Sequence, residues 1–547
     1  MPKFPRIVAL IGFFGLTAYG LWLRGEISDA RWLALLGGAW LLLVVAFRPH
    51  LPAQTPRFNR TVIRAAFLVA SVFAILSIQL IRIQILQRDA TVNRSASAAN
   101  GEMIANPRLQ REELRVKRGR VFDRNGIILA DTVRDGDFWR RVYPEPESAY
   151  VIGYYSPLLY GSDGLENEFN GPLSGQAANN PVIRWTNGVL HRPQQGIDLH
   201  LTLDATLQRV AHELLASRPG SVVLLDVHTG EVLVLASNPN YSPNMLFTLS
   251  PEEREKAVNY WQTLIDDPSR PLVLRATDGL FTPGSTFKLV TAATVIDTGI
   301  AVPDDIYLDD GSLDVNGRII VENNRPDPSI DEWTLREAVA WSLNIVFAQV
   351  GLQIGPELMR EYGDRFGFGS SVPFDLPVAR SQLSNEGDFL NAPVALAETA
   401  FGQGELLATP IHLAAIAASF VNGGVLMRPY LVDTFAAQDG RVTRRADPEV
   451  WLRPVAAETA EQVAAMMVNA VENGYAQGAH IGGLVVGGKT GTAELGDGDP
   501  HALFIGFVGA PEPRYAIAVV LEEGGSGPNQ ALVIGREVLM AAMLREP

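Results

Sequence analysis

A serine and a lysine stand three positions apart in the segment FTPGSTFKLV, which runs from Phe281 to Val290. The Pro-Gly pair before Ser285 breaks the chain, and an apolar helical pattern begins directly behind it. Residues i and i+3 share one face of a helix, so the Ser285 hydroxyl and the Lys288 amine can meet. A serine needs a base to become a nucleophile, and an unprotonated lysine can be that base. The pattern predicts nucleophilic catalysis by Ser285 with Lys288 as its base.

Lysine is scarce in this chain, which has five lysines among 45 basic residues. Arginine cannot release its proton at working pH, so it could not replace a lysine that acts as a base. The ordinary alternative for Ser285 and Lys288 is a surface pair in the first turn of a helix, because S-x-x-K also arises by chance.

A second lysine lies in the segment GGKTGTAE, in a β-rich run that contains Lys489, Thr490, Gly491 and Thr492. At a strand edge, Lys-Thr-Gly offers a cation, hydroxyl groups and a backbone N–H to a peptide carboxylate. Gly491 would leave room for a substrate to lie along the strand. The ordinary alternative is a tight glycine turn at the end of a strand.

The same lysine completes the phosphate-binding pattern G-x-x-x-x-G-K-[ST], from Gly483 to Thr490. A phosphate-binding loop must follow a strand and open a helix, yet the variable positions here are β-like. The chain then continues through Gly491 to ELGDGDP, which cannot form a helix. The context therefore argues against a nucleotide-binding enzyme.

A third motif, S-x-N, occurs twice. Ser342-Leu-Asn344 ends a helical run that opens with a capping box from Thr334 to Glu337. A serine and an amide at a helix junction can relay a proton and hold a substrate carbonyl. The other copy, Ser242-Pro-Asn244, has a central proline and is predicted to be a turn.

Five β-rich runs, with helical patterns between them, must position these motifs. SVVLLDVHTGEVLVLAS contains two runs around a turn at Val227–Gly230, and GLVVGGKTGTAEL, ALFIGFVGA and RYAIAVVLEE follow near the C-terminus. Short connections make the last three antiparallel neighbours. Helical patterns fill residues 285–470. The sequence predicts one α+β domain whose sheet is closed by its first and last segments.

Three apolar runs precede this domain: Ile7–Leu23, Trp32–Phe47 and Ala65–Ile81. A membrane-spanning helix needs roughly 17–25 residues, so we predict three spans at the short end of that range. Arg64 and Arg82 bracket the third run, where long side chains can reach the headgroups. The alternative is an interfacial hairpin made by the first two runs, with only the third run crossing.

The stretch between the apolar runs and the α+β domain begins as a polar linker. RVFDRNGIILADT is then predicted to be a hairpin with its turn at Asn125–Gly126. The region up to residue 196 is rich in Gly, Pro and Asn. It includes GSDGLENEFNGPLSG, which is predicted to be turns around one short helix.

Charge is unevenly distributed over the 547 residues, whose net charge is −15. Residues 1–120 carry 17 basic and 6 acidic side chains, so the rest of the chain is strongly acidic. An acidic main part argues against a nucleic-acid partner, and the basic start suits a membrane surface. The chain has no cysteine, which excludes disulfides, a cysteine nucleophile and cysteine metal sites.

Together and in this order, S-x-x-K, S-x-N and K-T-G are motifs of penicillin-binding proteins. From about residue 84 to its end, the chain resembles a class B penicillin-binding protein, a membrane-anchored peptidoglycan D,D-transpeptidase. RGRVFDRNGIILA is similar to the pedestal signature of that family, and GLENEFNGPLSG, TGEVLVLASNPNYSPN and FGQGELLATP resemble further family segments. The departures from the family pattern are Leu274, NGYAQGA and the first two membrane runs, since most members have one span, and all of them lie outside the three motifs.

The resemblance implies an α+β penicillin-binding/serine transpeptidase fold, with an antiparallel five-stranded sheet flanked by helices. It implies a membrane anchor in residues 1–85, with its last span at about 65–81. A pedestal or dimerisation-type domain is expected in residues 86–196, and a transpeptidase domain in residues 197–547.

The resemblance also implies residue roles in an acyl-serine mechanism on D-Ala-D-Ala stem peptides. Ser285 attacks the penultimate D-alanine carbonyl, Lys288 takes its proton, and Ser342 passes a proton to the leaving amine. The residues expected to bind the substrate are Asn344, Lys489, Thr490, Gly491 and Thr492, and the backbone N–H groups of Ser285 and Thr492 are expected to form the oxyanion hole. Lys489 should lower the pKa of Lys288 by like-charge repulsion. Neither a cofactor nor a metal is expected.

The implied ligands are stem peptides of lipid-linked or nascent glycan, and β-lactam antibiotics. The implied partner is a SEDS-family glycosyltransferase in the membrane. The catalytic domain is expected on the outer side of the cytoplasmic membrane. Charge supports this orientation, because Lys3 and Arg6 precede the first run, and the second loop carries three arginines and no acid.

Two alternatives from other classes stay open. A β-lactam sensor would need a cytoplasmic signalling domain, for which the second loop of about 17 residues has no room. A D,D-carboxypeptidase or β-lactamase-type hydrolase would need a positioned water and a base for deacylation, and no further motif supplies one.

Overall fold

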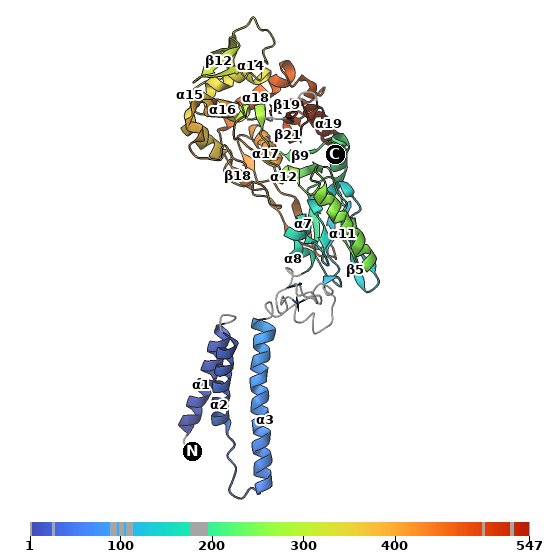
Figure 1. Cartoon of the computed structure of the whole chain (residues 1–547), viewed down its shortest axis with the longest axis vertical. Coiled ribbons are helices and arrows are strands. Elements are labelled where there is room, and N and C mark those ends of the chain that lie inside the picture. The colour runs from blue at the N-terminus through green and yellow to red at the C-terminus, as the bar shows by residue number, and fades with distance from the viewer. Residues whose placement is uncertain are drawn as a thin grey trace. The chain divides into compact units, whose positions relative to one another are not determined.

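The computed structural model describes residues 3–23, 28–87, 96–97, 103–104, 113–175, 195–494, 498–525 and 530–545. The chain divides into two compact units, Met1–Glu113 and Leu114–Pro547 (Figure 1). Most of the predicted polar linker lies outside the described residues.

The first unit consists mainly of three helices, α1 (Lys3–Trp22), α2 (Asp29–Phe47) and α3 (Arg57–Ile81). Helices α1 and α2 pack against each other, and α3 continues into a π-helical turn, η1 (Arg82–Leu86). A pair of short strands, β1 (Ala96–Ser97) and β2 (Met103–Ile104), follows. All three helices are long and apolar enough to cross a membrane.

The side chain of Arg82 differs from its predicted role as a headgroup anchor. It is 2% exposed, lies 4.8 Å over the Trp32 ring, and forms an ion pair of 3.3 Å with Asp29. A guanidinium can stack on an aromatic face and pair with a carboxylate at once, so Arg82 ties the end of α3 to the start of α2.

The second unit is built on a five-stranded antiparallel sheet in the order β10-β9-β21-β20-β19. Its strands are β9 (Gly220–Asp226), β10 (Val232–Asn238), β19 (Val485–Ala493), β20 (His501–Gly509) and β21 (Pro513–Leu521). The first and last segments of the predicted domain meet where β9 pairs with β21. The α+β prediction and the antiparallel order of the last three strands are therefore confirmed. Strand β19 forms one edge of the sheet.

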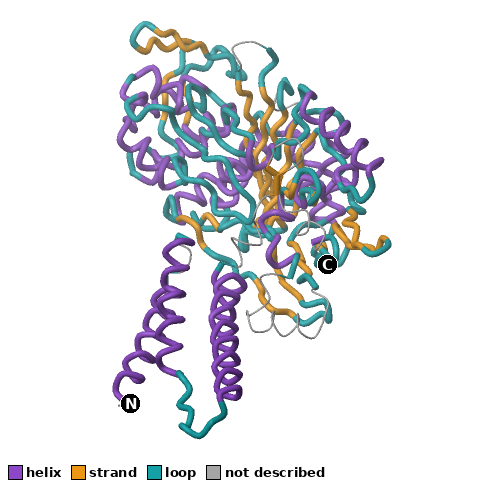
Figure 2. Tube along the Cα trace, turned by 60° about the horizontal axis from the view of Figure 1, so that its bottom comes forward, coloured by secondary structure: helices purple, strands orange, loops and turns teal. Residues whose placement is uncertain are grey.

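Helices cover both faces of this sheet, whose strands run through the middle of the unit (Figure 2). Val223, Ile505 and Ala518 point to one face, in the core that α17 (Pro410–Phe420) completes. Val222, Phe504 and Val519 point to the other face and pack against α10 (Ala205–Leu215) and α19 (Ala531–Leu544). Alternate residues of one strand thus enter two separate cores, which explains the continuous apolar runs in the sequence.

Besides α17, the second unit contains further helices and 3-10 turns. They are α10 (Ala205–Leu215), α11 (Pro251–Asp266), α12 (Arg275–Asp278), α13 (Lys288–Asp297), α14 (Leu335–Trp341), α15 (Asn344–Arg365), α16 (Pro393–Ala400), α18 (Ala457–Asn473) and α19 (Ala531–Leu544), with 3-10 turns η2 (Pro146–Ser148), η3 (Pro243–Leu246), η4 (Gly284–Thr286), η5 (Phe389–Asn391) and η6 (Gln477–Ala479).

A second sheet, of six strands, contains residues from both sides of the predicted pedestal boundary. Its order is β17-β16-β8-β3-β4-β5. The strands are β3 (Val121–Phe122), β4 (Ile128–Asp135), β5 (Phe138–Val142), β8 (Asp198–Leu201), β16 (Val432–Ala436) and β17 (Val442–Arg445). The predicted hairpin around Asn125–Gly126 is formed by β3 and β4. Strand β16 reaches this sheet from the middle of the predicted transpeptidase domain, so the boundary at residue 196 stays a prediction.

Two local predictions were wrong. The predicted single helix in residues 161–175 is two short helices, α7 (Gly164–Glu168) and α8 (Asn170–Leu173), preceded by α6 (Ala149–Ile152) and the pair β6 (Tyr155–Ser156) and β7 (Gly161–Ser162). Besides β16 and β17, the middle that was predicted to be helical contains further short strands, which are β11 (Ile306–Leu308), β12 (Ser312–Val315), β13 (Arg318–Val321), β14 (Glu332–Thr334), β15 (Leu426–Met427) and β18 (Val450–Leu452). The hairpin β12–β13 turns at Asn316-Gly317, which is a strong hairpin signal.

Candidate active site

The predicted nucleophile lies on a tight turn between sheet and helix. Ser285 belongs to the 3-10 turn η4, and the α-helix itself begins at Lys288, three residues later than predicted. Gly402 (φ +92°) packs against this turn, and a Cβ there would come within 1.8 Å of the Gly284 carbonyl oxygen. Only a glycine fits so close an approach, so the FGQG segment fixes the turn from outside. The Ser285 side chain remains half-buried.

The amine of Lys288 is completely buried and lies against the S-x-N motif. Its Nζ is 2.6 Å from the Ser342 carbonyl oxygen, 3.3 Å from Ser342 Oγ and 2.8 Å from Asn344 Oδ1. The Phe347 ring lies 5.5 Å below it. Within the described residues, no hydrogen bond joins the Ser285 hydroxyl to this amine. The structure therefore brings Lys288, Ser342 and Asn344 together, with Ser285 next to them on the preceding turn.

A second buried amine approaches Ser342 from the edge strand. Lys489, on β19, is 1% exposed, and its Nζ donates to Ser342 Oγ at 2.9 Å and to the Thr490 carbonyl oxygen at 3.1 Å. A hydroxyl can donate one hydrogen bond and accept two. Ser342 can therefore accept from Lys489 while it donates to a neutral Lys288, which makes a proton path between the two amines.

The electrostatic state of the two lysines follows from their burial. Desolvation lowers the pKa of Lys288 well below its usual value, the charge of Lys489 lowers it further, and the charge of Glu322 opposes both. The predicted like-charge effect of Lys489 is confirmed in direction. Burial lowers the pKa of Lys489 to about 7. A lysine that is neutral near physiological pH can act as a base.

The S-x-N corner carries backbone strain at its serine. Ser342 joins α14 to α15 with φ 61° and ψ 41°, in the left-handed region that non-glycine residues rarely occupy. Strained residues of this kind persist where surrounding contacts hold them, and they cluster at functional sites. The other copy of the motif lies on η3, where the Asn244 side chain bonds the backbone of Tyr143, in keeping with the predicted turn.

The remaining K-T-G residues line the edge of the sheet. Thr490 is buried and Thr492 is exposed. A Cβ at Gly491 would lie 2.8 Å from the Pro283 carbonyl oxygen and 3.0 Å from Thr286 Cγ2. The absent side chain therefore lets β19 pack on the nucleophile turn, and the predicted room for a substrate at Gly491 stays a prediction. Strand β19 continues unbroken through Thr490, which excludes the phosphate-binding loop.

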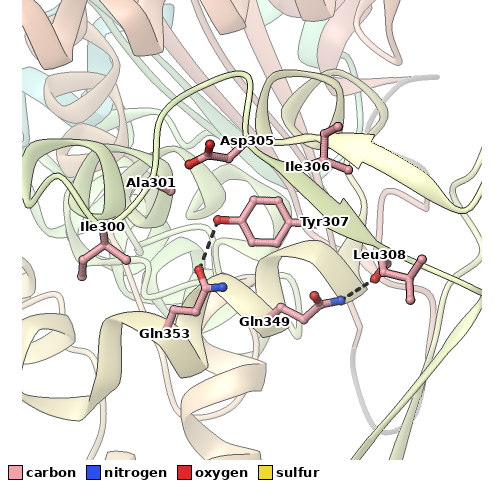
Figure 3. Close-up of a pocket in the computed structure, with 8 residues that line it drawn as sticks. All are labelled: Ile300, Ala301, Asp305, Ile306, Tyr307, Leu308, Gln349 and Gln353. Carbon is pink, nitrogen blue, oxygen red and sulfur yellow. Dashed lines mark hydrogen bonds between the residues drawn. The ribbon is translucent and has the colours of Figure 1, made fainter.

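One cavity of the second unit is separate from this site. A cavity of about 520 Å³ is lined by β11 and the outer face of α15, including Tyr307, Gln349 and Gln353 (Figure 3). The Tyr307 hydroxyl donates to Gln353 Oε1, and none of the predicted site residues lines this cavity.

Comparison with known proteins agrees with this geometry. Residues 220–540 match the penicillin binding protein transpeptidase domain, and residues 118–199 match the penicillin binding protein A dimerisation domain. The chain belongs to the class B penicillin-binding proteins.

Individual relatives extend over nearly the whole molecule. The peptidoglycan D,D-transpeptidase PbpA of Mycolicibacterium smegmatis is 32% identical, over 85% of this chain and 97% of its own. The peptidoglycan D,D-transpeptidase MrdA of Acinetobacter baumannii is 27% identical, over 72% of this chain and 64% of its own. The ceftriaxone acyl-enzyme complex of penicillin-binding protein A from M. tuberculosis is 31% identical, with a TM-score of 0.72 over 79% of this chain and all of that chain. The predicted transpeptidase fold is confirmed.

Three residues of this penicillin-binding protein touch the site but were not predicted. Glu322 and Asn324 contact the S-x-N corner from a segment that follows β13. Gln403 lies with its Nε2 3.5 Å from the Thr492 carbonyl oxygen. The sequence gives no local signal for Glu322 or Asn324, since their partners are about 20 positions away. Gln403 lies within a segment whose family resemblance was recognised, FGQGELLATP, and that resemblance was the available signal.

Proposed function

We propose that this chain is a serine-type D,D-transpeptidase that cross-links peptidoglycan stem peptides and is acylated by β-lactams. The observation that carries the proposal is the placement of Ser342 Oγ between two buried lysine amines, at 3.3 Å from Lys288 and 2.9 Å from Lys489. Relatives named peptidoglycan D,D-transpeptidase and a relative captured as a β-lactam acyl-enzyme support it.

In the acylation step, Ser285 Oγ attacks the penultimate D-alanine carbonyl and its proton passes to Lys288 Nζ. The peptide C–N bond breaks, an ester forms on Ser285, and Ser342 relays the proton from Lys288 to the leaving D-alanine nitrogen. The backbone N–H groups of Ser285 and Thr492 are proposed to hold the oxyanion, because the backbones of Gly284 and Thr492 approach closely.

Recognition and transfer use the edge strand. We assign Lys489, Thr490 and Thr492 to the terminal carboxylate, with Gly491 contributing its backbone and Asn344 a hydrogen bond to the substrate backbone. In the second step, the amine of another stem peptide attacks the ester carbonyl. That amine loses a proton to Lys288, the Ser285–carbonyl bond breaks, and the proton returns to Ser285 Oγ. The product is a new peptide cross-link.

A donor–acceptor assay separates transfer from hydrolysis. The full-length protein in detergent is incubated with a D-Ala-D-Ala stem pentapeptide and an excess of a D-amino acid as acceptor amine. Mass spectrometry should show the exchanged peptide as the main product. A tetrapeptide acid as the only product would identify a carboxypeptidase, and an unchanged pentapeptide would overturn the proposed activity.

We also propose that the catalytic unit lies outside the cytoplasmic membrane. Three spans carry a cytoplasmic N-terminus to an outer C-terminal unit, and the arginine-rich second loop suits the cytoplasm. The native chain lacks cysteine, so single cysteines can be labelled cleanly with an impermeant maleimide. Cysteines at Ser28 and Ser97 should react from outside, and one at Gln54 should not. Protection at Ser28 alone would favour one span, and protection at Ser97 would contradict this orientation.

We further propose that a SEDS-family glycosyltransferase in the membrane binds α3. Its support is the exposed apolar surface of α3, where Phe58 is 77% and Phe73 is 66% exposed. A photocrosslinking amino acid at Phe73 should capture such a partner in native membranes, whereas one at Phe14 on α1 should not. Equal capture of lipid alone at both positions would contradict this assignment.

A further inference from the structure

Glu322 is an acidic residue that follows the β12–β13 hairpin and contacts the start of α15. Its side chain is 8% exposed. Oε2 accepts hydrogen bonds from the backbone N–H of Asn344 and from that of Ile345 at 3.1 Å. Oε1 accepts from the Asn324 N–H at 2.9 Å. A carboxylate at the N-terminus of a helix satisfies free N–H groups and is stabilised by the helix dipole.

The same segment contacts the strained serine. The Asn324 side-chain amide donates to the Ser342 carbonyl oxygen at 2.9 Å, and that oxygen also accepts from Lys288 Nζ at 2.6 Å. Glu322 and Asn324 therefore contact both ends of the Ser342–Asn344 corner. These contacts flank Ser342, which has a left-handed conformation.

We propose that Glu322 is a positioning residue for acylation, whose carboxylate fixes the Ser342–Asn344 corner and provides the anionic counterpart to the buried lysine pair. The inference rests on the proposed function of that site. Asn324 shares the positioning role through its neutral amide, and it adds no charge.

The charged groups around Lys288 allow the effect of Glu322 on the pKa of Lys288 to be measured separately. Among the described residues, the ionisable groups that influence Lys288 are Lys489 on β19 and Glu322. Glu322 in turn is close to Tyr475, which follows α18 in the chain, and to Asp309, which follows β11. Burial is the main cause of the raised pKa values of Tyr475 and Asp309. Arg325 lies next to Asp309. Glu322 raises the pKa of Lys288, so removing its charge should let Lys288 lose its proton at lower pH.

The charge of Glu322 should make Lys288 a base of moderate strength. Burial and Lys489 both favour the neutral amine, which would leave Lys288 a weak proton acceptor if nothing opposed them. General-base catalysis is most effective when the pKa of the base lies near the working pH. Glu322 opposes the lowering of the Lys288 pKa without forming a direct ion pair with Lys288. It therefore preserves the basicity of Lys288 and leaves its amine available to accept a proton.

The test is the rate constant of acylation by a fluorescent penicillin, measured against pH on the full-length protein in detergent. Glu322→Gln should move the acid limb to lower pH and lower the plateau by about tenfold. Glu322→Asp should keep the limb in place with a lower plateau. Asn324→Ala should also lower the plateau without moving the limb. Glu213→Gln is the control, because Glu213 is exposed on α10, which packs on the opposite edge strand β10, and its variant should match wild type.

The outcomes distinguish a failure of the proposed function from a failure of the proposed role of Glu322. An unlabelled wild type would refute the proposed function itself. If the wild type is labelled but the acid limb of Glu322→Gln does not move, the proposed role of Glu322 is overturned, whether or not the plateau of the variant falls. If the melting temperature shows that Glu322→Gln does not fold, Asn324→Asp replaces it. The added carboxylate should move the limb to higher pH, and an unmoved limb would again overturn the proposal.

Discussion

Two regions of the second unit each bury a pair of cationic side chains, and they differ in what lies between the two cations. In the six-stranded sheet region, Arg118 and Arg141 are 3% and 1% exposed, and both pair with the fully buried carboxylate of Glu166. In the active site, Lys288 and Lys489 are equally buried, but the group between them is the neutral hydroxyl of Ser342.

The difference shows how residue type decides between structure and reactivity. Arginine stays protonated, so a buried arginine pair requires a carboxylate. Burial raises the pKa of Glu166, but the two guanidinium groups outweigh it and the net pKa is lowered, so Glu166 stays ionised. Lysine can give up its proton, and without a carboxylate in a direct ion pair it does so more easily. The arginine cluster, which has such an ion pair, holds the fold, and the lysine pair, which has none, supplies a base.

The largest expected effect is on chemistry at the lysine pair. Lys288→Arg keeps a cation of similar reach but removes the base, so the acylation rate should fall by about 10²–10⁴-fold. Stopped-flow labelling with a fluorescent penicillin measures the rate, and the melting temperature of the same sample checks the fold. A wild-type rate in a folded variant would show that Lys288 has only a structural role.

The next effect is on stability at the arginine cluster. Glu166→Gln leaves two buried guanidinium groups without a counter-charge, which should lower the free energy of unfolding by about 3–5 kcal/mol. Glu168→Gln, two residues away on the same helix and exposed, is the matched control and should unfold like wild type.

The sign of the pH dependence adds a second check on the same cluster. The pKa of Glu166 is lowered from 4.5, so its contribution to stability is present above that pH and is lost as pH falls through the folded-state pKa. Chemical unfolding of the full chain in detergent measures both effects. A Gln variant as stable as wild type at pH 7 would show that the carboxylate does not compensate the arginines.

The pH dependence of acylation sharpens the comparison further. The neutral form of Lys288 is the reactive one, and its pKa is lowered well below 10.5. The rate should therefore rise with pH and reach its plateau well before pH 10.5. A rate that keeps rising tenfold per unit up to that pH would mean that burial leaves the lysine pKa unchanged.

An exposed lysine provides the smallest expected effect. Lys256 pairs with Glu252 on the surface of α11, where both side chains are solvated. Lys256→Met should leave both the acylation rate and the melting temperature within error of wild type. A clear loss of acylation would mean that lysine chemistry outside the buried pair contributes.

Much of the fold and of the motif geometry could be predicted from local sequence. The five β-rich runs were recognisable because both faces of the central sheet are buried, which produces continuous apolar runs such as VVLLD. The capping box at Thr334 fixed the start of α14, and the helix ended at the S-x-N corner as expected. The roles of Ser285, Lys288 and the K-T-G residues remain proposals that the geometry supports.

The misses share a physical cause, which is dependence on distant partners. The packing of η4 on the Cα of Gly491 was not foreseen, because strand sequence does not reveal it. Glu322 and Asn324 bond residues about 20 positions away, so no local pattern marks them. Strand β16 joins the second sheet through pairing with β8, more than 200 residues earlier in the chain. Only the hairpin at Asn316-Gly317 had a local signal that was overlooked.

The central claim is that Ser285 carries the acyl group, and mass spectrometry of the benzylpenicillin adduct tests it most directly. The full-length protein should gain one penicilloyl group, and peptide mapping should locate it on Ser285. Ser285→Ala should gain none, while the control Ser242→Ala, in the other S-x-N copy, should be labelled like wild type. A penicilloyl adduct that persists in folded Ser285→Ala would contradict the account.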